Sequence, residues 1–263
     1  MVEIALFNVN DFALLFGAFL SLVLALLLIL RKPEGRIKKQ YWMFLSLFFF
    51  LGILHSVDTL FYWSTNIKAF LAPISLNLFF VFGFVLFLQG PLLYWFTKAA
   101  IFRNFSLKKS DLLHLLPALI YPVYMYLIYY RFDEVYKLPY INNWSHATSD
   151  PYFEGMIWLQ RIAVFGYSLL CVYQLRQYVT HLKSTHSSLS KVDLQWLKLL
   201  LFGFLIVSSW SIITLIETRF IRWDIDSFMG GTDLYLRFIY ITALVVYLLK
   251  NSNGLAEIQV EHT

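Results

Sequence analysis

The chain has 263 residues, of which 59% are hydrophobic and only 14% are charged, and its formal net charge is +5. A soluble domain is about half apolar and about a quarter charged, so this composition excludes an ordinary soluble protein and indicates a polytopic membrane protein. The single cysteine, Cys171, excludes an intramolecular disulfide and a multi-cysteine metal site.

A helix that crosses about 30 Å of hydrocarbon needs roughly 20 mostly apolar residues. Seven segments meet this requirement, so the sequence predicts an all-α, seven-transmembrane helix bundle over residues 1–250. The predicted spans are approximately 11–30, 41–63, 69–97, 112–130, 156–178, 195–216 and 232–249. The first apolar run has no basic region before it and no signal-peptide cleavage motif after it, so we expect it to stay in the protein as the first span.

Lysine and arginine counts predict the orientation of these spans. The connections at 31–40, 98–109 and 176–198, together with Lys250, hold fourteen of these residues, and the opposite side holds seven. Cytoplasmic loops carry the excess of positive charge in membrane proteins. The sequence therefore predicts the N-terminus outside and the C-terminus inside, with residues 251–263 as a short cytoplasmic tail.

Ionisable and polar residues inside the predicted spans are the candidate functional residues, because a charge at bilayer depth is costly and marks a functional site by default. In this orientation they concentrate in the outer half of the bundle, where Asp58, His55, Asn77, Arg161 and Arg237 lie. We expect Asp58 to face the interior and to pair with Arg161 or Arg237. The cluster is either a structural clamp or a polar pocket open to the outside, and His55 could alternatively make the bundle respond to external pH.

Other features of the chain have simpler interpretations. Gly90 and Pro91 lie near the inner end of the third predicted span, where proline removes a backbone donor and predicts a kink; this kink is either a packing feature or a hinge that relays a signal. Residues 131–155 form the longest predicted connection, on the outer side. Tryptophans near span ends, such as Trp63, Trp158 and Trp223, are typical interfacial anchors.

Enzyme motifs are not found in the sequence. His55 and Asp58 could supply two metal ligands one helical turn apart, but a catalytic zinc site needs about three, and the other histidines fall in loops, in the tail or at the opposite face. The sequence lacks the H-E-x-x-H, G-x-S-x-G and Walker-type patterns. We therefore expect no enzyme, no metal and no cofactor.

Three stretches together carry a family resemblance: "LFLQGPLLYWFTKAA" (86–100), "KKSDLLHLLPALI" (108–120) and "VDLQWLKLLLFGFLI" (192–206). With this order and topology, the chain resembles the seven-helix membrane domain at the N-terminus of bacterial AraC-type transcription regulators. The resemblance implies a sensor in the bacterial inner membrane that detects a small ligand or a membrane signal and passes it to a cytoplasmic helix-turn-helix domain.

The resemblance also implies partners. DNA would be contacted only through a C-terminal domain that this sequence does not contain, and a homodimer would suit paired half-sites. We expect the chain to be a sensor piece of a longer protein, the alternative being a stand-alone relative. A small-solute transporter or lipid-handling membrane protein is the rival class, although seven spans do not divide into two equal repeats.

Overall fold

A computed structural model describes residues 7–30, 36–102, 105–185, 194–221 and 226–250. This part of the chain is all-helical and contains no strand. The α-helices are α1 (Val9–Leu30), α2 (Arg36–Trp63), α3 (Thr65–Leu71), α4 (Val85–Ile101), α5 (Leu116–Met125), α6 (Glu134–Asn142), α7 (Trp144–Ser149), α8 (Pro151–Thr185), α9 (Gln195–Ile216) and α10 (Asp226–Lys250). Shorter turns are the 3-10 helices η1 (Leu76–Leu78) and η2 (Lys109–Leu115) and the π-helical turns η3 (Tyr126–Tyr130) and η5 (Glu217–Ile221).

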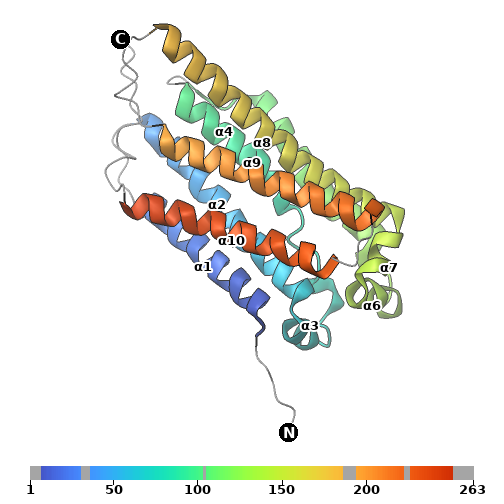
Figure 1. Ribbon diagram of the computed structural model, residues 1–263. Helices are drawn as coiled ribbons and strands as arrows, with labels where there is room; N and C mark the ends of the chain where they lie inside the picture. Colours follow the sequence, from blue (N-terminus) through green and yellow to red (C-terminus); the bar gives the residue numbers. More distant parts are fainter. Residues whose placement is uncertain (1–6, 31–35, 103–104, 186–193, 222–225, 251–263) are drawn as a thin grey trace.

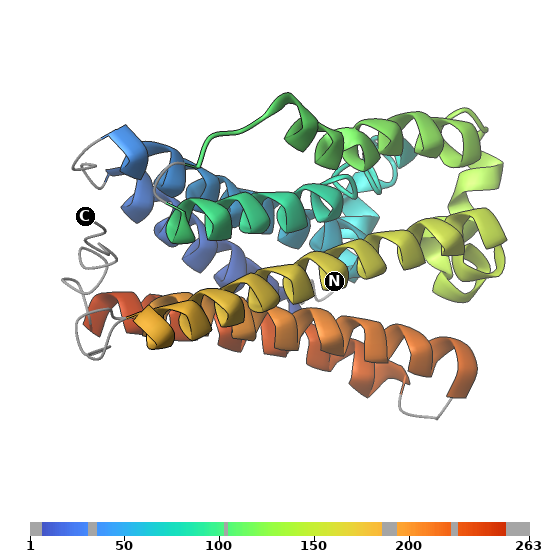
Figure 2. The same ribbon diagram turned by 90° about the horizontal axis from the view of Figure 1, so that it is seen from above.

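The long helices run side by side along one common direction (Figures 1 and 2). The short helices α3, α6 and α7 gather at one end of the bundle, which also holds the start of α1. The end of α10 lies at the opposite end, so the first and last described helices run in the same direction beside each other. We call these the α6–α7 end and the Lys250 end.

Within the described residues, six stretches are long and apolar enough to cross a membrane. They are Val9–Leu30, Tyr41–Trp63, Lys109–Tyr130, Pro151–Leu182, Gln195–Ile216 and Gly231–Lys250. These match six of the seven predicted spans, and the chain is accordingly a multi-pass membrane protein. The predicted tail at 251–263 lies outside the described residues, as does Trp223.

The third predicted span, 69–97, is wrong as a continuous helix. Its first residues end α3 at Leu71, and its longer helical part, α4, begins only at Val85 and has 17 residues, which corresponds to a rise of about 26 Å at 1.5 Å per residue. Residues 72–84 form turns and the short helix η1 instead. Apolar composition alone does not reveal whether a segment is helical.

The predicted outer connection at 131–155 also has more structure than expected. It contains α6, α7 and the first turn of α8, which begins at Pro151 and extends to Thr185. Asn143 starts α7 as its N-cap, because its side chain accepts hydrogen bonds from the backbone N–H groups of Ser145 and His146. These short helices cover the α6–α7 end of the bundle (Figure 1).

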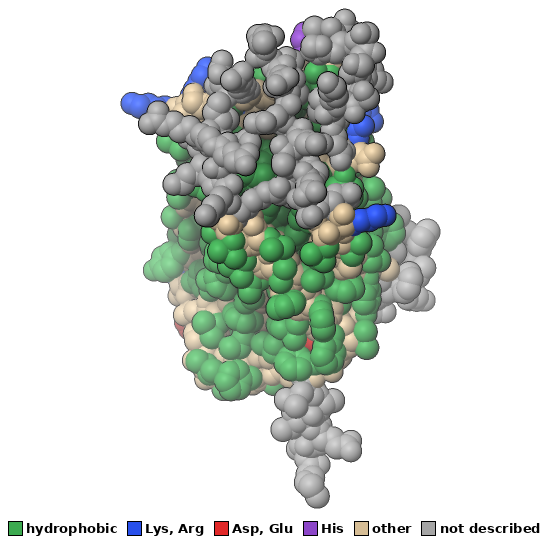
Figure 3. All heavy atoms as spheres, turned by 90° about the vertical axis from the view of Figure 1, so that its left-hand side faces the viewer, with side chains coloured by type: hydrophobic (Ala, Val, Ile, Leu, Met, Phe, Trp, Pro, Cys, Tyr) green, Lys and Arg blue, Asp and Glu red, His purple; other side chains and the backbone are tan. Residues whose placement is uncertain are grey.

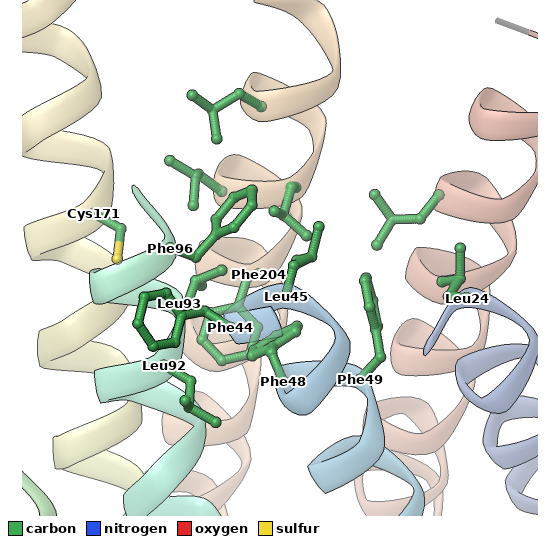
Figure 4. Close-up of a cluster of buried hydrophobic side chains, with 14 of the residues drawn as sticks. Leu24, Phe44, Leu45, Phe48, Phe49, Leu92, Leu93, Phe96, Cys171 and Phe204 are labelled. Atoms are coloured by element: carbon green, nitrogen blue, oxygen red, sulfur yellow. The ribbon is translucent and has the colours of Figure 1, made fainter. Parts of the chain in front are cut away.

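The main core fills the half of the bundle toward the Lys250 end. Figure 4 shows aromatic and aliphatic side chains from α2, α4, α8 and α9 meeting there. Phe96 and Leu93 of α4 have no exposed surface, and the ring centroid of Phe96 lies 4.4 Å from that of Tyr41. Large interlocking rings of this kind supply the dispersion contacts that hold membrane helices together, because lipid removes the usual hydrophobic driving force between them.

Glycines on two helices admit tyrosine rings from neighbouring helices. A Cβ atom on Gly90 of α4 would lie 2.6 Å from the Tyr167 ring of α8, and one on Gly203 of α9 would lie 2.5 Å from the Tyr240 ring of α10. The hydroxyl of Tyr240 also donates a 2.9 Å hydrogen bond to the carbonyl of Leu200. Only glycine leaves room for these contacts.

The outer surface of the bundle is apolar along its length. In Figure 3, hydrophobic side chains cover most of the part of this face that is not drawn in grey, and the visible lysine and arginine side chains lie toward the Lys250 end. Helix α1 exposes Phe12, Phe16 and Phe19. This belt is typical of a protein whose helices face hydrocarbon, with charged groups kept near its edge.

Candidate functional site

A large cavity lies between the helices on the α6–α7 side of the main core. Its volume is about 870 Å³, and its walls come from α1, α2, α8, α9 and α10, with Gln89 of α4. Side chains from α7, including Trp144 and Thr148, line it at the α6–α7 end. Ligand pockets usually enclose about 300–1,000 Å³, so this space is large enough for a small organic molecule.

The cavity combines apolar walls with buried polar groups. Phe48, Phe49, Phe204 and Val207, all of them buried, form its apolar part. The polar and charged groups that line it deeper in the bundle include Gln89 of α4 and, from the membrane-spanning helices, Ser21, His55, Ser56, Arg161, Ser211, Asp233 and Arg237. An apolar enclosure with a few convergent polar groups is the usual form of a small-molecule site.

Two ion pairs lie along the cavity wall. Asp233 and Arg237 are one helical turn apart on α10, and Nε of Arg237 lies 3.2 Å from Oδ2 of Asp233. Nε of Arg219 lies 2.9 Å from Oε1 of Glu154, and this pair joins η5, which follows α9, to the start of α8. Such pairs lower the cost of charges near the membrane interior.

Three of the predicted site residues come together here. His55, Arg161 and Arg237 line the same cavity from α2, α8 and α10, and the charges of both arginines act on the His55 ring. Arg161 itself is within electrostatic range of Asp233 and Arg237. Sequence spacing could place each residue on its helix, but only the packing of three helices could bring them to one wall.

A smaller cavity of about 110 Å³ adjoins the large one and shares His55 and Arg161 with it. Asp58, Gln160 and Tyr121 also line it. The large and small cavities therefore meet beside His55 and Arg161.

Asp58 has a different partner from the one predicted. Its Oδ1 accepts a 3.1 Å hydrogen bond from the backbone N–H of Phe82, and among the described residues it makes no ion pair with Arg161 or Arg237. The predicted ion pair between Asp58 and an arginine is therefore wrong. The reason is that residues 72–84 are not helical, so Phe82 offers a free donor that a helix would have used internally.

Side chains satisfy much of the backbone of this non-helical segment. Tyr121, Tyr129 and Tyr130 donate hydroxyl hydrogen bonds of 2.7, 2.8 and 3.0 Å to the carbonyls of Phe80, Leu76 and Phe79. From α8, Nε2 of Gln160 donates to the carbonyl of Gly83 at 2.9 Å. Irregular backbone at membrane depth is tolerated only where protein groups satisfy it, and this explains three of the five tyrosines in the apolar Lys109–Tyr130 span.

Phe80 holds this segment in a sharp turn. Its φ is 65°, a left-handed conformation that is uncommon for a residue other than glycine. Its ring packs against Tyr62, Tyr129 and Phe153 with centroids 5.0–5.4 Å apart. Contacts on several sides compensate for the strain in the backbone.

Asn77 does not belong to the cluster. It lies in η1, its side chain is exposed, and it lines neither cavity. Gly90 and Pro91 are buried inside α4, which continues through them to Ile101, and the Gly90–Tyr167 contact gives this pair a packing role. The hydroxyl of Tyr167 lies 2.6 Å from Nδ1 of His114, which links α8 to η2.

Polar contacts connect the short helices at the α6–α7 end to one another. Nζ of Lys68 donates a 2.7 Å hydrogen bond to the carbonyl of Ile141, and partial burial lowers the pKa of this lysine. Tyr140 donates a 2.7 Å hydrogen bond to Asp150. Burial, followed by the bonds to Asp150 and Tyr136, raises the pKa of the Tyr140 hydroxyl well above its usual value.

Several cavity residues were not predicted from the sequence. Gln89 and Ser211 are buried, and their Oε1 and Oγ atoms have no hydrogen-bond partner among the described residues. Gln89 stands out in the apolar run "LFLQGPLL", so its polarity was a usable signal. Asp11 gave a weaker signal, because it is the first residue of the predicted span 11–30, where charged residues are common.

These features define an all-helical, multi-pass membrane protein with a polar cavity inside its bundle. Among the described residues, no group of three or more histidine, cysteine, aspartate or glutamate side chains could hold a metal ion. The comparisons with protein-family models, curated proteins and solved structures gave no match.

Proposed function

We propose that this chain is a membrane-embedded sensor domain, which binds a small ligand in the large cavity and passes the event to a cytoplasmic output at the Lys250 end. The cavity carries this proposal because α10, the last described helix, forms part of its wall through Asp233, Leu234, Arg237 and Tyr240. A ligand there contacts α10 and four other long helices at once. In the full proposal the output is a helix-turn-helix domain of the AraC type, in the inner membrane of a bacterium, and this last step rests on the resemblance of the three sequence stretches.

The proposed mechanism is a change in helix packing. A ligand shifts a conformational equilibrium only by its difference in affinity for the two states. The Lys250 half of the bundle is closely packed, so we expect α10 to move as a rigid rod when its cavity half is drawn toward a ligand. Such a movement would change the Gly203–Tyr240 contact between α9 and α10.

The test measures that movement directly. The chain is embedded in nanodiscs, and spin labels are placed at Lys198→Cys of α9 and Lys250→Cys of α10, both of which are exposed; the natural Cys171 is buried. Three probes with the same ten-carbon body are added in turn: 4-phenylbutyrate, 4-phenylbutanol and 4-phenylbutylamine. We expect at least one probe to change the distance between the labels.

A matched pair of glycine variants shows whether the cavity is responsible. Gly17 lines the cavity from α1, and Gly166 lies on α8 away from it; a Cβ on either meets no atom within 4 Å. Gly17→Leu should fill part of the cavity and abolish the change, whereas Gly166→Leu should preserve it. A label distance that no probe alters would contradict the sensor proposal.

A transporter is the second candidate, favoured by the non-helical segment at 72–84 beside the smaller cavity. Discontinuous helices next to a binding site are typical of secondary transporters. Uptake of a probe into liposomes that contain the chain, without a change in label distance, would favour this candidate. A change in label distance without uptake would favour the sensor.

A further inference from the structure

Arg161 is the starting point for a narrower inference, which rests on the proposed ligand-binding function of the large cavity. Arg161 lies on α8 where the large and small cavities meet. Its guanidinium group has five donors in a planar fork. Among the described residues, none makes a hydrogen bond or ion pair with it.

Each carboxylate that lines the large cavity has a bonded partner other than Arg161, although Oδ1 of Asp233 has no hydrogen-bond partner among the described residues. Glu154 is paired with Arg219, and Asp233 is paired with Arg237. Asp11 lies at the start of α1, where its Oδ2 accepts hydrogen bonds from the backbone N–H of Asn8 and the hydroxyl of Ser64. No carboxylate of the described cavity wall is therefore dedicated to Arg161.

In the large cavity, Arg161 and Arg237 share one nearby carboxylate, and the carboxylate beside Arg161 in the small cavity, Asp58, already accepts a hydrogen bond from Phe82 through Oδ1. Asp233 lies within electrostatic range of Arg161 and is also paired with Arg237, so one carboxylate serves two guanidinium groups. Both arginine charges also act on His55. Charges in a low-dielectric interior interact strongly, and an unpaired buried charge is costly, so an anion placed between these groups would stabilise the bundle.

The remaining cavity wall indicates the body of the ligand. Phe48, Phe49 and Phe204 provide aromatic surface, and Gln89 and Ser211 add one unpartnered polar atom each. At about 870 Å³, the space far exceeds what an inorganic ion fills. A molecule that fits has one anionic head and an apolar or aromatic body.

We propose that the cavity binds an organic monoanion, whose anionic group is held by Arg161 and Arg237 and whose apolar body lies against the phenylalanine wall. A planar guanidinium binds a carboxylate through two parallel hydrogen bonds, and lysine cannot reproduce this geometry. The anion is supplied either by a free carboxylate or by the headgroup of an anionic lipid, since both present the same chemistry to Arg161.

Equilibrium binding of radiolabelled 4-phenylbutyrate to the chain in phosphatidylcholine nanodiscs tests this proposal, with empty nanodiscs as the correction for partitioning. We expect saturable binding that unlabelled 4-phenylbutyrate displaces at least tenfold more effectively than 4-phenylbutanol or 4-phenylbutylamine. Arg161→Gln should weaken binding at least tenfold, and Arg161→Lys should weaken it by less. The matched control is Arg131→Gln, because Arg131 is exposed and lines neither cavity.

Each outcome has a defined meaning. Equal displacement by the alcohol, or undiminished binding by Arg161→Gln, overturns the anion proposal, and so does the absence of saturable binding. If the Gln variant does not fold, the ranking of the three head groups on the parent chain decides. If phosphatidylglycerol added to the nanodisc competes with the probe, this result supports the anion site and identifies its natural anion as a lipid headgroup.

The two proposals fail separately. If all three probes bind equally and move α10, the sensor function stands and the anion proposal falls. If 4-phenylbutyrate binds through Arg161 without changing the label distance, the anion site stands and the sensor proposal falls.

Discussion

The two halves of the bundle are built from the same helices but are packed in opposite ways. Toward the Lys250 end, Phe44, Phe48, Phe96 and Phe204 pack among aromatic and aliphatic side chains, and Phe48 and Phe204 also border the cavity (Figure 4). Toward the α6–α7 end, the helices enclose a cavity and carry charged groups. One half provides close packing, and the other half provides space and polarity for binding.

The comparison also shows two ways in which the backbone hydrogen-bonding groups of a buried segment find partners. In the Lys250 half, regular helices bond their own backbone. In the α6–α7 half, residues 72–84 depend on tyrosine, glutamine and aspartate side chains from three other elements. The second solution requires specific side chains, so it is more sensitive to single substitutions.

The largest effect is expected for Phe96→Ala in the close-packed half. Comparable substitutions in soluble cores cost roughly 3–5 kcal/mol, but lipid is as apolar as a protein core, so we expect a loss of about 2–3 kcal/mol in the free energy of unfolding. Leu234→Ala, on the cavity wall, should cost less than about 1 kcal/mol because that side chain already borders empty space. Denaturation in mixed micelles measures both, and equal losses would refute the contrast between the halves.

Gly90→Ala should destabilise the protein by about 1–3 kcal/mol, the usual cost of overpacking, because its methyl group would overlap the Tyr167 ring. Gly166→Ala on α8 is the control; it meets no atom within 4 Å, and alanine favours a helix by about 1 kcal/mol relative to glycine. Thermal denaturation in detergent compares the two. If Gly90→Ala is neutral, the packing role of Gly90 is wrong and the hinge interpretation regains weight.

Asp58 provides a test of the α6–α7 half. Asp58→Leu leaves the N–H of Phe82 without an acceptor and should cost about 1–3 kcal/mol. Asp58→Asn keeps an acceptor oxygen and should recover most of that loss. The free energy of unfolding distinguishes a backbone clamp from an ion pair, since a pair with arginine would make Asn nearly as damaging as Leu.

The smallest effect is expected at the covering helices and concerns pH. The pKa of Tyr140 is raised in the folded state, so its contribution to stability is fully present below the ordinary tyrosine pKa of about 10 and is lost as pH rises above it. Tyr140→Phe should therefore make the alkaline decline in unfolding free energy shallower. Lys68, whose pKa is lowered, acts in the opposite direction, so the variant must be compared with its parent chain at each pH; identical pH slopes would refute the prediction.

The extent of prediction from sequence differs between the two halves. Six spans follow from apolar length alone, because a bilayer imposes a minimum number of apolar residues on any helix that crosses it. The same rule failed for residues 69–97, since residues 72–84 are apolar without being helical. The positive φ of Phe80 and the tyrosine bonds to this segment depend on contacts between residues more than 40 positions apart.

The candidate site divides in the same way. The sequence alone indicated that charged residues in an apolar span are candidate functional residues, and it placed His55, Arg161 and Arg237 toward one end of the bundle. Only the tertiary structure decided their partners. In it, Asp58 accepts a hydrogen bond from a backbone amide, Asn77 lies at the surface and Arg161 lines a cavity. The physical reason is that the bilayer acts on each segment separately through its composition, whereas hydrogen bonds and ion pairs depend on which helices pack side by side.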